Sequence, residues 1–179
     1  MPIIIIPGIH SPELTNCFVE AVQNSIQQEY LILPTDKYLP YDALSIYQWL
    51  EQARSPSQPM SFITFSAGVV GGIGAALAWQ LRGGQVQSFI AFDGWGMPLV
   101  GSFPIYRVSH DRFTDWSSGI LGGGTGSFYA DPTVSHLDLW RSPNICLGWR
   151  YLAYGLKTRC SLIDYLQNIL SKNIVGMVD

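Results

Sequence analysis

The sequence predicts an α/β fold: a three-layer sandwich with a mostly parallel β-sheet and helices on both faces. Short runs rich in β-branched and aromatic residues alternate with segments of helical periodicity, as in repeated strand–helix–strand units. Most of these runs are apolar throughout, which is typical of strands buried on both faces. Hydrophobic residues make up 47% of the 179 residues and charged residues 13%. This composition favours one globular domain over residues 1–179.

Five strands are expected, and they cover residues 3–6, 30–33, 62–65, 88–92 and 104–108. The first helix should begin after Ser11, because the following proline suits the first helical position. Asp42 is expected to cap a second helix. Its buried stripe is predicted to be Leu44, Tyr47 and Leu50. Two further helices are expected over residues 69–81 and 162–170.

Periodicity fails between Ser109 and Trp149, where several glycines and polar residues occur together. A loop of this length in a compact domain is usually functional, so we expect a long functional loop here.

Charge and cysteine usage exclude several classes of protein. The net charge is −3 and no basic run is present, so nucleic acid is not an expected partner. The three cysteines are far apart and lack C-x-x-C spacing, which predicts buried thiols rather than disulfides or a zinc site. The start of the chain does not resemble a signal peptide, so a cytoplasmic location is expected. Residues 62–79 carry no charge, but they begin like a strand, so no membrane span is expected.

A serine directly follows the third expected strand, in the segment Thr64-Phe65-Ser66-Ala67-Gly68. This segment resembles the nucleophile elbow G-x-S-x-G of the α/β-hydrolase superfamily, with Thr64 in place of the first glycine. Small residues around the serine let strand and helix approach each other in a strained turn. The resemblance implies a small, lidless serine esterase or lipase with Ser66 as nucleophile. It implies no cofactor and no metal.

A serine hydroxyl needs a base to accept its proton, and the chain has three histidines, His10, His110 and His136. In the superfamily the order along the chain is serine, acid, histidine, which favours His136 as the base. Asp111 is the preferred acid, because it follows the fifth expected strand. Asp93, at the end of the fourth strand, is the alternative.

Asp115 ranks third among the candidate acids, and each of the three carboxylates can instead belong to a turn or a helix cap. By resemblance, the backbone N–H of Ala67 supplies one oxyanion donor, and the N–H of Ile9 or His10 supplies the other. Trp95 and Met97 are candidates for an apolar wall that binds an acyl group. The expected substrate is a small or acyl ester or thioester. Its identity and the oligomeric state of the protein are left open.

Two other functions remain. Gly68, Gly72 and Gly74 also resemble the nucleotide-binding turn of short-chain dehydrogenases, with Asp93 at about the distance of a ribose-binding acid. Against this, two strand–helix units precede the turn and the dehydrogenase Tyr-x-x-x-Lys is absent. The third interpretation is a non-catalytic α/β module that binds a partner.

Overall fold

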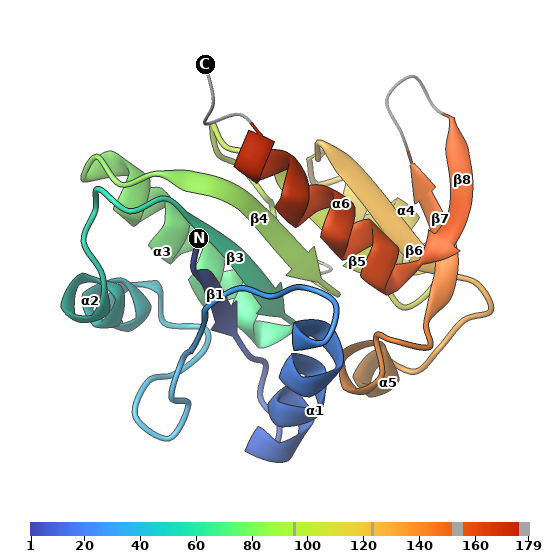
Figure 1. Cartoon of the computed structure of the whole chain (residues 1–179), viewed down its shortest axis with the longest axis horizontal. Coiled ribbons are helices and arrows are strands. Elements are labelled where there is room, and N and C mark those ends of the chain that lie inside the picture. The colour runs from blue at the N-terminus through green and yellow to red at the C-terminus, as the bar shows by residue number, and fades with distance from the viewer. Residues whose placement is uncertain (95, 123, 152–155, 176–179) are drawn as a thin grey trace.

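The computed structural model describes residues 1–94, 96–122, 124–151 and 156–175 and places eight strands in one sheet (Figure 1). The strand order is β2-β1-β3-β4-β5-β6-β7-β8. Neighbouring strands from β2 to β6 pair in parallel. The pairs β6–β7 and β7–β8 are antiparallel. The strand bounds are β1 Ile3–Ile6, β2 Tyr30–Ile32, β3 Met60–Phe65, β4 Val86–Phe92, β5 Ile105–Ser109, β6 Gly126–Ala130, β7 Leu147–Tyr151 and β8 Lys157–Ser161.

Six helices accompany the sheet within the described residues. Their bounds are α1 Pro12–Gln23, α2 Ala43–Ala53, α3 Ala67–Leu81, α4 Arg112–Gly119, α5 His136–Arg141 and α6 Leu162–Val175. The predicted N-cap of α2 is confirmed, because the Asp42 carboxylate accepts hydrogen bonds from the backbone N–H groups of Leu44 and Ser45.

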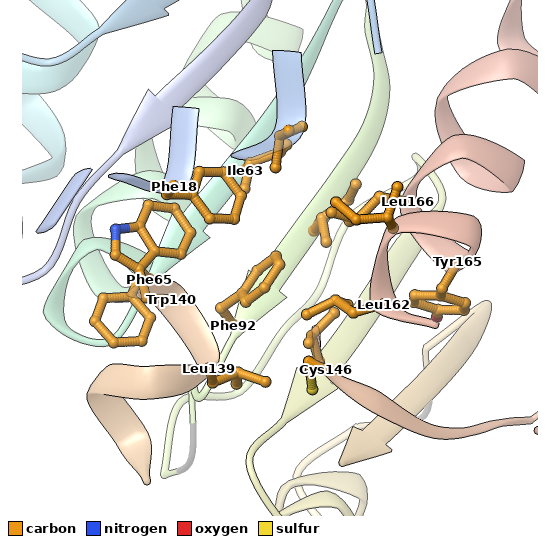
Figure 2. Packing of buried hydrophobic residues seen from close by; sticks show 14 of the residues in the cluster. Phe18, Ile63, Phe65, Phe92, Leu139, Trp140, Cys146, Leu162, Tyr165 and Leu166 are labelled. Carbon is orange, nitrogen blue, oxygen red and sulfur yellow. The ribbon is translucent and has the colours of Figure 1, made fainter. Parts of the chain in front are cut away.

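Two hydrophobic cores lie on opposite faces of the sheet, because successive strand residues point to alternate sides. Ile3 and Ile5 pack with α1, α5 and α6, whereas Ile4 and Ile6 pack with α2 and α3. Figure 1 shows α1, α5 and α6 on the near face. In the near core, the rings of Phe18 and Trp140 stack with centroids 3.7 Å apart (Figure 2). The predicted α/β architecture is therefore confirmed.

The five predicted strands are present, but the prediction of a long loop between Ser109 and Trp149 was wrong. This stretch holds α4, β6, α5 and the start of β7. The later strands escaped prediction because β7 and β8 are only partly buried and carry polar residues, so no apolar run marks them. The expected stripe of α2 is also corrected, since Leu44 is 64% exposed and Ile46 is buried in its place.

The predicted burial of the cysteines holds for one of the three: Cys146 is buried, Cys160 is half-buried and Cys17 is exposed. Residues 62–79 form the end of β3 and most of α3. Among the helices of the described ranges, none combines the length and the apolar character that a membrane crossing requires.

Candidate active site

Ser66 is the single residue between β3 and α3, and its backbone is strained. Its φ is 53° and its ψ is −119°, in a region that residues with a side chain rarely adopt. Such strain persists where the surrounding structure enforces it, and it is concentrated at functional sites. A β-carbon added to Gly68 would lie 2.3 Å from the carbonyl oxygen of Pro7. The start of α3 therefore packs directly against the segment that follows β1, and only glycine fits there.

Thr64 stands where the elbow motif has its first glycine, and the structure shows how a larger residue is accommodated. Its side chain is fully buried, and its hydroxyl donates a hydrogen bond to the carbonyl oxygen of Ile90, at 3.2 Å. A β-carbon added to Gly72 would lie 2.7 Å from the Thr64 methyl group. Gly72, one turn inside α3, thus provides the space that a glycine at position 64 would otherwise provide.

Asp93 follows β4, and its buried carboxylate accepts three hydrogen bonds. Its Oδ2 accepts one from His136 Nδ1 at 2.7 Å and one from His110 Nδ1 at 2.9 Å. Its Oδ1 accepts one from the backbone N–H of His110 at 2.9 Å. The Asp93 side chain is 0% exposed, so these donors replace water around its charge. The backbone of Asp93 also has a positive φ, of 48°.

Both histidine rings direct Nδ1 toward this carboxylate, with their planes at 81° to each other. An ionised carboxylate only accepts hydrogen bonds, so each Nδ1 carries a hydrogen. In a neutral ring, Nε2 then holds the lone pair that a general base needs. The ring of His136, the first residue of α5, also stacks on Phe65, with centroids 4.6 Å apart and planes at 23°. This stacking and the hydrogen bond to Asp93 fix the position of the His136 ring.

Ser66, Asp93, His110 and His136 line one cavity of about 680 Å³. Ser66, Asp93 and His110 directly follow the parallel strands β3, β4 and β5, whose carboxyl ends meet at one edge of the sheet, and His136 begins α5. The remaining lining residues are Ala67, Val70, Phe113, Thr114 and Ser117. The structure thus places the predicted nucleophile, the predicted base and the alternative acid in one cavity.

Asp111 does not contact His136, which corrects the preferred pairing of acid and base. Its carboxylate caps α4, accepting from the backbone N–H of Thr114 at 2.7 Å. Burial raises the pKa of Asp111, but the hydrogen bonds from Thr114 and the nearby His110 ring outweigh this effect and leave that pKa lowered. Asp111 begins a helix, so its carboxylate satisfies that helix end. The third-ranked acid, Asp115, lies in a different cavity, beside Arg107.

The loop after β1 lies against Ser66, as expected for a loop that supplies an oxyanion donor. A β-carbon on Gly8 would lie 3.0 Å from the Ser66 β-carbon. The Ile9 side chain is 74% exposed. The His10 ring donates from Nδ1 to the carbonyl oxygen of Ser11 at 2.9 Å and lines a separate cavity of about 320 Å³. His10 is not among the residues that line the Ser66 cavity.

Of the two residues expected to form an acyl-binding wall, Trp95 lies outside the described residues. Met97 is partly buried against the core that contains α2 and α3 and is not among the residues lining the Ser66 cavity. The apolar side chains in the cavity are instead those of Val70 and Phe113. Phe113 was not singled out because α4 was not predicted, and Val70 was not because the helix predicted over residues 69–81 is apolar on nearly all sides.

Asp93, His110 and His136 also form the group best placed to hold a metal ion in the described ranges. One ligand atom from each lies within 4.8 Å of the others. Two imidazoles and a carboxylate are a common ligand set for divalent transition metals. A metal bound there would replace the hydrogens on Nδ1. His110 was assigned no preferred role from the sequence, although its place just after β5 is where strand ends line a crevice.

No protein-family model matches this sequence, and no curated protein is similar enough to it to count as a relative.

Proposed function

We propose that this protein is a serine hydrolase in which Ser66 is the nucleophile, His136 the general base and Asp93 the acid that orients it. One observation carries the proposal: the strained Ser66 shares a cavity with His136, whose Nδ1 donates to the buried Asp93 carboxylate at 2.7 Å. A nucleophile, a base and a group that orients the base are the three parts that acyl transfer requires. The elbow-like sequence around Ser66 supports the same function.

The reaction begins when the Ser66 hydroxyl attacks the acyl carbon of an ester or thioester. Nε2 of His136 accepts the hydroxyl proton, and the bond to the leaving alcohol or thiol breaks as His136 returns that proton to it. This leaves an acyl-serine. Water then attacks the acyl carbon, with His136 accepting its proton and giving it to Ser66 as the carboxylic acid leaves. Asp93 stabilises the imidazolium in both steps without accepting a proton.

The negative charge that develops on the acyl oxygen needs donors near Ser66. The backbone N–H of Ala67 is one, at the first turn of α3, where the positive end of the helix dipole adds to its effect. The loop after β1 supplies the second, from the N–H of Ile9 or His10, because Gly8 lies against Ser66. These donors stabilise charge without any reorganisation during the reaction.

The cavity suits a small acyl group. Its volume of about 680 Å³ is within the range of pockets that enclose small molecules. Val70 and Phe113 offer apolar contacts, while Thr114 and Ser117 offer hydroxyl groups. We therefore assign as substrate class a short-chain ester or thioester.

The direct test is labelling with a fluorophosphonate probe, followed by mass spectrometry of the modified peptide. We expect label on Ser66, and we expect Ser66→Ala to lose both the label and the hydrolysis of p-nitrophenyl butyrate. Ser57→Ala is the matched control, because Ser57 is an exposed serine that does not line the Ser66 cavity. It should label and hydrolyse like the wild type. A folded wild-type protein that takes no label would overturn the proposal and favour the non-catalytic module.

The proximity of Asp93, His110 and His136 favours a second candidate, a metal-dependent hydrolase that uses these three residues as metal ligands. The two candidates give opposite results. A metal hydrolase would lose activity after dialysis against a chelator, regain it with Zn²⁺ or Mn²⁺, and keep it in Ser66→Ala. The serine hydrolase would keep its activity through dialysis and lose it in Ser66→Ala.

The dehydrogenase-like candidate has less support. The space beside Gly68, where a pyrophosphate would approach the helix, is filled by the carbonyl oxygens of Ile6 and Pro7. Carbonyl oxygens repel phosphate oxygens. Calorimetry with a nicotinamide dinucleotide tests this candidate, and we expect no heat of binding.

A further inference from the structure

A second cavity, also of about 680 Å³, lies on the other side of α4 from the Ser66 cavity. Phe113, Thr114 and Ser117 face the Ser66 cavity, whereas other residues of the same helix face this one. The residues lining the second cavity are Arg107, Arg112, Asp115, Trp116, Gly119, Ile120, Gly124, Thr125, Gly126, Ser127 and Tyr151. None of them takes part in the proposed reaction.

Two buried charged side chains in this cavity keep unpaired polar atoms. Arg107 is 4% exposed and donates from one Nη to the carbonyl oxygen of Gly122, at 2.5 Å, but its Nε has no partner among the described residues. Asp115 is 9% exposed, and its Oδ1 also lacks a partner there. Burial lowers the pKa of Arg107 and raises that of Asp115. The two charges attract each other, and a hydrogen bond with Ser127 also lowers the pKa of Asp115. Each still keeps one polar atom without a partner, which is costly for a buried charge, so this pair in the wall of a cavity indicates a ligand.

Two arginines and one carboxylate line this cavity, although the chain is acidic overall. Arg107, Ser127 and Tyr151 stand opposite one another in a row across β5, β6 and β7, on one face of the sheet, and all three line the cavity. With the exposed Arg112, two of the ten Lys and Arg residues therefore line the cavity, in a chain of net charge −3. Asp115 is the one carboxylate among the described lining residues. The balance of charge favours an anion.

We propose that this cavity binds a small aromatic oxyanion that also carries a hydrogen-bond donor. The guanidinium groups of Arg107 and Arg112 attract its carboxylate or phosphate group, since arginine matches the planar geometry of oxyanions. Asp115 accepts from the donor of the ligand, and the rings of Trp116 and Tyr151 contact the aromatic part. This site is independent of the serine-hydrolase proposal.

The test is an NMR titration of the Ser66→Ala protein at constant ionic strength. The probes are 4-hydroxybenzoate, its neutral analogue 4-hydroxybenzamide, benzoate without the hydroxyl donor, 4-hydroxyphenyl phosphate and inorganic phosphate. We expect 4-hydroxybenzoate to bind more tightly than benzoate, and the benzamide not to bind. Amide shifts should be confined to residues 124–127 and α4. Comparison of 4-hydroxybenzoate with 4-hydroxyphenyl phosphate, and inorganic phosphate alone, distinguishes a carboxylate ligand from a phosphate ligand.

Three results would overturn the site. The first is the absence of shifts with every probe, which would mean that water satisfies the unpaired atoms. The second is shifts centred on residues 66–67 and 136, which would place the probe in the Ser66 cavity. The third is equal binding of the charged and neutral analogues. Because Ser66 is absent throughout, loss of hydrolase activity does not affect any of these outcomes.

Variants provide an independent check. Arg112→Gln should weaken 4-hydroxybenzoate binding about two- to fivefold, as expected for a solvent-exposed charge. The paired variant Arg107→Met/Asp115→Asn removes both buried charges together and should weaken binding at least about tenfold. Arg141→Gln, an exposed arginine on α5, is the matched control and should bind like the wild type. Wild-type affinity in the paired variant, with a dispersed amide spectrum, would contradict the proposal.

Discussion

At the scale of single residues, the site depends on side chains held in unusual backbone conformations. Ser66 and Asp93 are the two residues other than glycine that have a positive φ in the described part of the chain. Each directly follows a parallel strand, and both line the same cavity. Positive φ costs free energy, so the surrounding packing must hold both residues in place. The strain therefore occurs at the two positions to which we assign nucleophile and acid.

The first prediction separates the two candidate acids. Asp93→Asn should lower kcat about 10³- to 10⁴-fold, because an amide no longer stabilises the His136 imidazolium or fixes its tautomer. Asp111→Asn should change kcat by less than about threefold, since asparagine caps a helix as well as aspartate does. Steady-state hydrolysis of p-nitrophenyl butyrate measures both. Equal losses in the two variants would contradict the assignment of Asp93.

His110 is a positioning residue in this scheme, because its ring reaches the reaction only through Asp93. His110→Ala removes one of the three donors to the buried carboxylate and should lower kcat about tenfold, with KM changed less than twofold. His110→Asn restores a donor and should recover most of kcat. If asparagine is no better than alanine, or if KM carries the whole effect, His110 does not act through Asp93.

At the scale of elements, the close approach of α3 to the end of β1 determines the geometry of the turn. Helix α3 contains four glycines, at 68, 71, 72 and 74, which is unfavourable for an isolated helix. Added β-carbons at all four would lie within 2.7 Å of a neighbouring atom. Tertiary packing thus outweighs helix propensity here, since it requires a smooth helix surface against the sheet and α2.

This packing predicts a large difference between two glycine-to-alanine variants. Gly68→Ala places a methyl group against backbone carbonyl oxygens and should lower the free energy of unfolding by about 2–4 kcal/mol. Gly119→Ala is the matched control at the end of α4, where an added β-carbon meets nothing within 4 Å. It should be neutral or stabilising by up to about 1 kcal/mol. Urea unfolding followed by circular dichroism measures both, and similar stabilities would contradict the packing.

At the scale of the whole molecule, the sheet separates two hydrophobic cores. The near core lies between the sheet and the helices α1, α5 and α6. Cys146 belongs to this core and lies close to Leu162 in the same cluster (Figure 2). Its burial makes it a measure of the integrity of the whole fold. Burial raises the pKa of the Cys146 thiol to about 11. A thiol reacts as thiolate, so Cys146 should be inert in the folded protein.

The corresponding prediction concerns alkylation by iodoacetamide at pH 8. With a pKa of about 11, roughly one Cys146 thiol in a thousand is ionised at that pH, and the side chain is only 3% exposed. The exposed Cys17 should react first. Mass spectrometry over time should show Cys146 modified at a useful rate only in urea. Equal rates for Cys17 and Cys146 without urea would contradict this packing.

The sequence by itself determined the central strands, the start of the first helix, the cap of the second and the turn that presents Ser66. These features are local: an apolar run, a capping residue or a small residue beside a serine is visible within a few positions. The later strands were not predicted, because partial burial leaves no apolar run. The sequence also singled out His136, through chain order and the scarcity of histidines.

Only the tertiary structure decided which carboxylate partners His136. Asp93 and Asp111 both follow predicted strands, and the sequence favoured Asp111. In the fold, the ends of β3 and β4 are adjacent, which brings Asp93 into the Ser66 cavity, while Asp111 turns its carboxylate to the start of α4. The bond from His136 to Asp93 joins residues 43 positions apart. Such a contact depends on strand order and helix placement, which local periodicity does not encode.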